Sequence, residues 1–204
     1  MVSLTSHGTL VTASQAELDA LCDTFAREHC VRLRHLLSAD LLQRVMTAVQ
    51  SADFVDRIHQ GTGIEPPPRD RMMVANSTLG LLHFLANDPA LVRFVETVTG
   101  EAPLGRLMGN LYTISPTAGH FDTWHDDCSE GRRIAFSLNL STEPYRGGLL
   151  QIRDRDTEAL LHEVANTGVG DAILFRIAPG LQHRVSALEG TTPRTAFAGW
   201  YHSA

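Results

Sequence analysis

Two stretches decide the fold class of this chain: 107–114, which reads LMGNLYTI, and 133–140, which reads RIAFSLNL. Both are short and apolar, and they are rich in residues that favour β-strands. Four more segments of this kind follow, separated by turn residues: Gly148–Arg153, Ala172–Arg176, His183–Ala187 and Thr195–Tyr201. Many short strands divided by glycine and proline turns predict a sandwich or barrel over residues 105–204.

The chain before residue 105 shows helical periodicity instead. Ser14 with Glu17 forms a capping-box pattern ahead of apolar residues at helical spacing. We expect three further helices, one capped by Ser38, one around Leu79–Leu85, and one from Asp88 to Gly100. Cys30–Leu33 is predicted as a short strand between the first two helices. Helices first and strands later favour an α+β architecture, with helices packed on a curled sheet.

Residues 61–71, GTGIEPPPRDR, contain three successive prolines, so the sequence predicts an irregular loop there. Pro66–Pro68 is either a passive connector or part of a lid over a site. No other segment divides the chain. We therefore expect one domain over 1–204, with 1–104 as mainly helical support and 105–204 as the catalytic core.

Composition narrows the classes of function. The 204-residue chain has a formal net charge of −6, which argues against a nucleic-acid partner. No apolar run approaches the roughly 20 residues of a membrane span, and the N-terminus lacks a signal-peptide pattern, so a cytoplasmic protein is predicted. Three cysteines without a C-x-x-C pair indicate neither a disulfide framework nor a structural zinc site.

A candidate metal site lies in the strand-rich half. His125 and Asp127 form a His-X-Asp pair, and His183 follows 58 residues later. On a strand, residues two apart point to the same side, so both side chains of the pair can reach one ion. Two imidazoles and one carboxylate suit ferrous iron with open coordination positions. Arg194 follows His183 by eleven residues, and its planar guanidinium can donate two parallel hydrogen bonds to an organic carboxylate.

Residues 105–202 resemble the iron(II)- and 2-oxoglutarate-dependent dioxygenases, in particular the prolyl 4-hydroxylase-like group. Six features typical of that family occur here in order. They are the tyrosine strand at Tyr112, His125-Asp126-Asp127, the strand Arg132–Leu140, the turn Gly147-Gly148, the strand Gly170–Phe175 that precedes His183, and the Arg194–Trp200 strand that ends in Gly-Trp.

The resemblance implies a double-stranded β-helix, or jelly roll, with packed N-terminal helices. It implies His125, Asp127 and His183 as iron ligands and Arg194 as the partner of the 2-oxoglutarate C5 carboxylate. Tyr112 matches the family position that supports this carboxylate. Asn110 is predicted to share the face of Tyr112 and is a further candidate for contact with the cosubstrate. Independently of the family, Trp124 and Arg133 are candidates for the substrate pocket wall because they lie beside the metal-site residues.

The reaction implied is hydroxylation of a C–H bond of a small metabolite or amino acid, using dioxygen, with decarboxylation of 2-oxoglutarate to succinate. Ascorbate is a candidate supporting reductant. Asp127 favours hydroxylation because halogenating relatives carry a small residue there. Three alternatives stay open: a peptidyl hydroxylase of the prolyl type, a non-catalytic sensor barrel that binds metal and 2-oxoglutarate, and a zinc hydrolase. The sequence leaves the oligomeric state undetermined.

Overall fold

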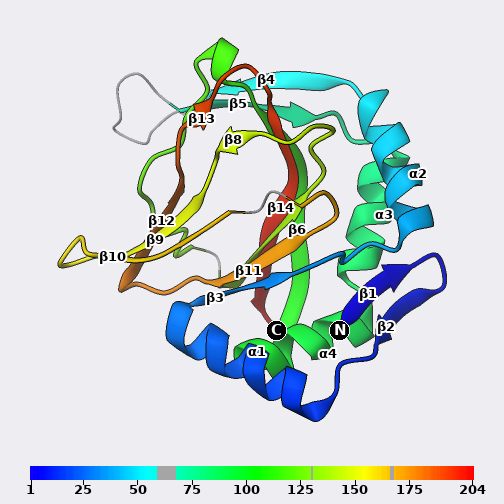
Figure 1. Ribbon diagram of the computed structural model, residues 1–204, viewed down its shortest axis with the longest axis vertical. Helices are drawn as coiled ribbons and strands as arrows, with labels where there is room; N and C mark the ends of the chain where they lie inside the picture. The colour runs from blue at the N-terminus through cyan, green and yellow to red at the C-terminus, as the bar shows by residue number, and fades with distance from the viewer. Residues whose placement is uncertain (59–67, 130, 166–167) are drawn as a thin grey trace.

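A computed structural model describes residues 1–58, 68–129, 131–165 and 168–204. Its framework is a seven-stranded sheet in the order β3-β11-β7-β14-β6-β5-β4, which we call the major sheet. A three-stranded minor sheet, β10-β9-β12, lies against it (Figure 1). Neighbouring strands run antiparallel in both sheets. This is the α+β jelly-roll arrangement that was expected, with the helices on the face of the major sheet opposite the minor sheet.

The strands of the major sheet are β3 (Cys30–Leu33), β4 (Phe54–Ile58), β5 (Arg69–Met73), β6 (Leu104–Ile114), β7 (Arg132–Asn139), β11 (Ala172–Arg176) and β14 (Arg194–Ser203). Those of the minor sheet are β9 (Leu150–Asp154), β10 (Leu160–Val164) and β12 (Leu181–Val185). The described residues also form two small two-stranded sheets: the hairpin of β1 (Val2–Thr5) with β2 (Gly8–Val11), and the long-range pair of β8 (Arg146–Gly147) with β13 (Leu188–Glu189).

The described residues form four α-helices: α1 (Gln15–Glu28), α2 (Ala39–Gln50), α3 (Ser77–Ala86) and α4 (Pro89–Thr99). Three of them begin directly after the predicted caps Ser14, Ser38 and Asp88, and α3 follows Asn76, which was not predicted as a cap. At α1 both halves of the capping box form between Ser14 and Glu17. Asp88 caps α4 through the Ala90 N–H, and Gly100 ends this helix in a left-handed conformation. No helix within the described residues combines the length and apolar character needed to cross a membrane.

The alternation along β7 separates two hydrophobic layers. Ile134, Phe136 and Leu138 face the helices and join the main core. Ala135 faces the minor sheet and packs in a second cluster with Ile152 and other residues of both sheets. The region between the two sheets is therefore walled by β-strands, and the candidate site lies there.

Two expectations for the N-terminal half are wrong, and a third is not tested. The first hundred residues are not simply helical, because β1 and β2 form a hairpin and β4 pairs with β5 at the edge of the major sheet. Residues 69–71 belong to β5 and not to an irregular loop, since pairing with β4 and β6 stabilises an extended chain after the prolines. Residues 59–67, which include Pro66 and Pro67, lie outside the described residues, so a lid there stays a prediction.

The tight turn before β9 yields a stability prediction. Gly147 has a φ of 67°, and a Cβ there would lie 2.1 Å from the Ala187 backbone oxygen. We expect Gly147→Ala to lower the free energy of unfolding by more than about 2 kcal/mol, because left-handed strain and a backbone clash add. Gly190 has a φ of 77° with open space around its Cα, so Gly190→Ala should cost only about 1 kcal/mol. Urea denaturation measures both, and equal losses would contradict the clash.

Candidate active site

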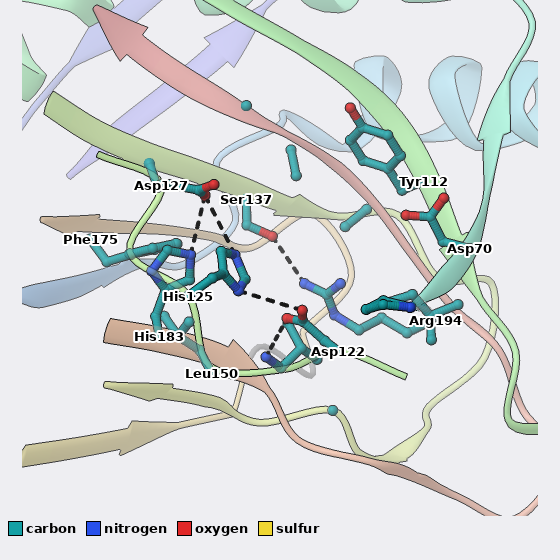
Figure 2. Close-up of a pocket in the computed structure, with 18 of the residues that line it drawn as sticks. Asp70, Tyr112, Asp122, His125, Asp127, Ser137, Leu150, Phe175, His183 and Arg194 are labelled. Carbon is teal, nitrogen blue, oxygen red and sulfur yellow. Dashed lines mark hydrogen bonds and ion pairs between the residues drawn. The ribbon is translucent and has the colours of Figure 1, made fainter. Parts of the chain in front are cut away.

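His125, Asp127 and His183 converge between the two sheets. Each offers one ligand atom, and the three atoms lie within 4.8 Å of one another. Asp127 Oδ2 lies 3.3 Å from His183 Nε2 and 3.6 Å from His125 Nε2 (Figure 2). Among the described residues no other group of histidine, cysteine and acidic side chains is arranged in this way. Two imidazole nitrogens and a carboxylate are a donor set that suits ferrous iron.

The two histidines are held together by backbone pairing. His183 lies in β12, and its ring packs edge-on against Phe175 of β11. The His125 N–H donates to the His183 carbonyl at 3.1 Å, and the His183 N–H donates to the His125 carbonyl at 2.8 Å. This isolated bridge places the two rings side by side, with centroids 4.3 Å apart.

Asp127 reaches the histidines by a different route from the one expected. The His-X-Asp pair does not lie on a regular strand, because Asp127 has a φ of 54°. The chain turns after His125, and this left-handed residue brings its carboxylate back toward the rings. Aspartate is among the few non-glycine residues that tolerate this conformation.

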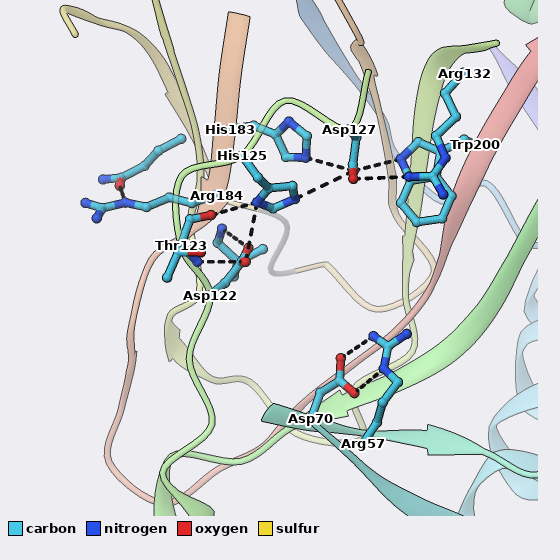
Figure 3. A network of polar contacts seen from close by, with 12 residues as sticks. Arg57, Asp70, Asp122, Thr123, His125, Asp127, Arg132, His183, Arg184 and Trp200 are labelled. Atoms are coloured by element: carbon cyan, nitrogen blue, oxygen red, sulfur yellow. Dashed lines mark hydrogen bonds and ion pairs between the residues drawn. The ribbon is translucent and has the colours of Figure 1, made fainter. Parts of the chain in front are cut away.

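The carboxylate of Asp127 is fixed by two donors from the major sheet. Trp200 Nε1 donates to Oδ2 at 2.9 Å, and Arg132 Nη1 donates to Oδ1 at 3.2 Å (Figure 3). The Arg132 guanidinium also lies over the Trp200 ring, 3.8 Å from its centroid. Burial opposes ionisation, but hydrogen bonds and the charges of both histidines hold the Asp127 pKa far below its usual range. The site thus keeps a negatively charged ligand atom in place.

The histidines differ in their electrostatic surroundings. Burial disfavours the charged form of His125, but the hydrogen bond to Asp127 and the charge of Asp122 outweigh it and raise the pKa to about 9. Deep burial lowers the pKa of His183. His125 Nδ1 lies 2.7 Å from the Thr123 carbonyl, which assigns a proton to Nδ1 and turns Nε2 toward Asp127. A divalent cation among the three groups can take the place of the proton on Nε2.

Arg194 lies in the same cavity, which has a volume of about 620 Å³. The residue is 9% exposed, and its Nη2 donates to the Ser137 hydroxyl at 3.0 Å. Its buried Nε has no hydrogen-bond partner among the described residues. A buried guanidinium with an unsatisfied donor is costly unless an anion binds there. This orphaned donor fits a carboxylate-bearing ligand next to the three potential metal ligands.

Tyr112 also lines the cavity. The Arg57 guanidinium lies 4.5 Å from its ring centroid, and Arg57 binds the Asp70 carboxylate through two hydrogen bonds of 2.9 and 2.6 Å. Burial raises the pKa of the Tyr112 hydroxyl, so this group is a neutral hydrogen-bonding side chain. This cluster at β4, β5 and β6 was not anticipated from the sequence.

Of the three remaining residues predicted for the site, only one lines the cavity. Trp124 lines the cavity, but Arg133 and Asn110 are not among its lining residues. Arg133 is exposed, because β7 has an extra residue opposite the Tyr201–His202 step of β14, and this bulge exchanges the directions of Arg133 and Arg132. Asn110 accepts a hydrogen bond from the Leu111 N–H through its own Oδ1. Arg132, and not Arg133, therefore lines the cavity, and no sequence pattern marks the bulge.

Comparisons with known proteins agree with this geometry. Residues 108–202 match the sequence model of the 2OG-Fe(II) oxygenase superfamily. A search of curated proteins finds no match. Three similar solved structures share the fold of this chain.

An oxidoreductase of the 2OG-Fe(II) oxygenase family from Burkholderia pseudomallei has 13% sequence identity and a TM-score of 0.69, with 99% of this chain and 96% of that one covered. The epimerase SnoN from nogalamycin biosynthesis has 19% identity and a TM-score of 0.67, with coverages of 94% and 84%. A Pseudomonas putida prolyl-4-hydroxylase has 18% identity and a TM-score of 0.59, with coverages of 95% and 98%. The superfamily match over residues 108–202, the shared fold and the cluster of His125, Asp127 and His183 together support a 2-oxoglutarate-dependent dioxygenase of the 2OG-Fe(II) oxygenase type.

Proposed function

We propose that this enzyme hydroxylates a C–H bond of a small metabolite or amino acid, and that His125, Asp127 and His183 hold its ferrous ion. The observation that carries the proposal is the convergence of these three side chains with the buried Arg194 in one cavity. When bound, ferrous iron with 2-oxoglutarate and dioxygen supplies an oxidant for C–H bonds, and 2-oxoglutarate is converted to succinate and carbon dioxide.

Each protein group has a separate task in this proposal. Asp127 contributes the anionic ligand, and the donors of Trp200 and Arg132 keep its carboxylate in one orientation. The Thr123 carbonyl keeps the His125 proton on Nδ1, which leaves Nε2 for the ion. Arg194 binds the distal carboxylate of 2-oxoglutarate, and its hydrogen bond to the Ser137 hydroxyl fixes the orientation of the guanidinium. The apolar walls at Leu150, Phe175 and Val185 exclude water from the reacting groups.

The cavity supports a small substrate. Its volume of about 620 Å³ lies within the range of roughly 300–1,000 Å³ that is usual for small-molecule sites. 2-Oxoglutarate takes part of this space, so the substrate must be compact or only partly enclosed. Arg57, Asp70 and Tyr112 add polar groups to the wall that can orient it.

Succinate formation tests the proposal. Purified enzyme is incubated with Fe(II), ascorbate and 2-oxoglutarate, with pools of amino acids, small carboxylic acids or proline-containing peptides. Succinate that rises with one small-molecule pool, with one oxygen added to a component of that pool, supports the proposal. Turnover with peptides alone would replace it with a peptidyl hydroxylase. Binding of metal and 2-oxoglutarate without turnover in any pool would favour the sensor.

A further inference from the structure

The segment that carries His125 lies along the edge of β12 as an added, irregular strand. The Val185 N–H donates to Asp122 Oδ2 at 2.8 Å, and His125 exchanges backbone hydrogen bonds with His183. At the other end, Phe121 forms an isolated bridge with Arg69. Between residues 119 and 131, the described residues form no helix and no regular strand. The position of His125 therefore depends on a few contacts at a sheet edge.

Trp124, the residue before His125, provides an additional attachment. Two guanidiniums contact its ring, and the Cζ atoms of Arg184 and Arg153 each lie 4.5 Å from the ring centroid. Arg184 follows His183 in β12, and Arg153 lies on the neighbouring strand β9. The indole thus spans both strands at the level of the paired histidines. Such cation–π contacts contribute roughly 0.5–2 kcal/mol each, depending on exposure.

Both guanidiniums are held in place by glutamines across the strand pair. Arg153 donates from Nε and Nη2 to Gln182 Oε1 at 2.9 and 2.7 Å, and Arg184 donates from Nε to Gln151 Oε1 at 2.7 Å. The register of β9 and β12 places Arg153 opposite Gln182 and Arg184 opposite Gln151. Because each arginine is anchored by a neighbour in the sheet, the pair forms a fixed platform for the indole.

We propose that Trp124 is a positioning residue for the metal centre, and that its stack on Arg153 and Arg184 fixes His125 beside His183. This inference rests on the proposed function, because it takes His125 and His183 as ligands of one ion. Trp124 and His125 are adjacent in the chain, so the stack of the indole on its platform restrains the main chain that carries the His125 imidazole. The three ligand atoms are then no longer held together before the ion arrives, and the affinity for the ion falls.

Manganese(II) binding, measured by calorimetry without oxygen, tests the inference in the full-length protein. We expect Trp124→Leu to raise the Kd for Mn(II) about 10-fold or more, the scale seen when outer contacts of metal ligands are lost. Trp124→Phe keeps an aromatic face for the arginines and should stay within about threefold of the unaltered protein. The matched control is Phe54→Leu, which removes the ring that lies 5.7 Å from the Arg71 guanidinium outside the cavity lining. It should lower stability without changing the Kd for Mn(II).

The outcomes are distinct. An unaltered protein that does not bind Mn(II), or binds it equally well with Asp127→Gly, removes the metal site itself and with it the proposed function. If the unaltered protein binds Mn(II) and Trp124→Leu binds it equally well, only the positioning role is overturned. A Phe variant as weak as the Leu variant overturns it too. Should Trp124→Leu fail to fold, the double variant Arg153→Met with Arg184→Met decides, since an unchanged Kd there contradicts the platform.

Discussion

Asp127→Ala should abolish succinate formation and weaken Mn(II) binding by more than about 100-fold, beyond the loss typical for an outer-shell contact. The carboxylate oxygen lies 3.3 and 3.6 Å from the two imidazole nitrogens, so its removal deletes the anionic member of the donor set. It also leaves the Trp200 and Arg132 donors without their acceptor. Calorimetry with Mn(II) measures the binding loss, and a succinate assay measures the activity.

Two further variants separate loss of the ligand from strain. Alanine at a φ of 54° is strained, whereas glycine accepts that conformation, so Asp127→Gly tests the carboxylate without the backbone cost. Asp126→Ala is the neighbouring control, because the Asp126 carboxylate pairs with Arg155 and the Cys128 N–H and does not reach the three ligand atoms. It should bind Mn(II) normally. Full activity in either Asp127 variant would defeat the ligand assignment.

Arg194→Met should weaken 2-oxoglutarate binding about 10- to 150-fold, the equivalent of losing a charge-assisted hydrogen bond of roughly 1.5–3 kcal/mol. The guanidinium is buried and its Nε has no hydrogen-bond partner among the described residues, so an anion in the cavity gains a fixed charge and a donor there. The effect should appear as a higher KM for 2-oxoglutarate with a smaller change in kcat. Titration of the Mn(II)-loaded protein with 2-oxoglutarate gives the Kd directly.

Arg133→Met is the matched control for this charge removal, because Arg133 is exposed and outside the cavity. Its affinity for 2-oxoglutarate should not change. Arg194→Lys should bind with intermediate affinity, since lysine keeps the charge but not the planar fork. An unchanged affinity in Arg194→Met would remove this residue from the cosubstrate site and leave its buried donor unexplained.

The sequence predicted the strand-rich half well because its signals are local. Apolar segments and turn residues predicted both ends of β6, β7, β11, β12 and β14 to within three residues of their observed bounds. Two helix starts were equally clear in the sequence, since Ser14 and Asp88 are the N-caps directly before α1 and α4. The β1–β2 and β4–β5 hairpins were missed because their strands are short and partly exposed, so they lack a clear apolar alternation.

The candidate site was predictable only as far as residue types and spacing carry. The spacing of His125, Asp127, His183 and Arg194 indicated their convergence, and the structure brings them into one cavity. The residue spacing did not reveal the irregularities of the backbone. The left-handed Asp127 and the β7 bulge each depend on tertiary pairing, so the direction of Arg132 could not be read from a strand pattern. The contacts of Trp200 with Asp127 and of Trp124 with two arginines likewise join residues far apart in the chain.

The reciprocal backbone hydrogen bonds between His125 and His183 bear on metal selectivity. Two of the three proposed metal ligands, His125 and His183, are cross-strand neighbours, and the spacing of their main chains is that of a β-sheet. The third donor stands on a turn outside any strand. In the proposed site, an ion of different radius would meet two imidazoles at a fixed main-chain spacing and a carboxylate held by Trp200 and Arg132. Changing the preference among iron, manganese and cobalt should therefore require substitutions that release the Asp127 carboxylate.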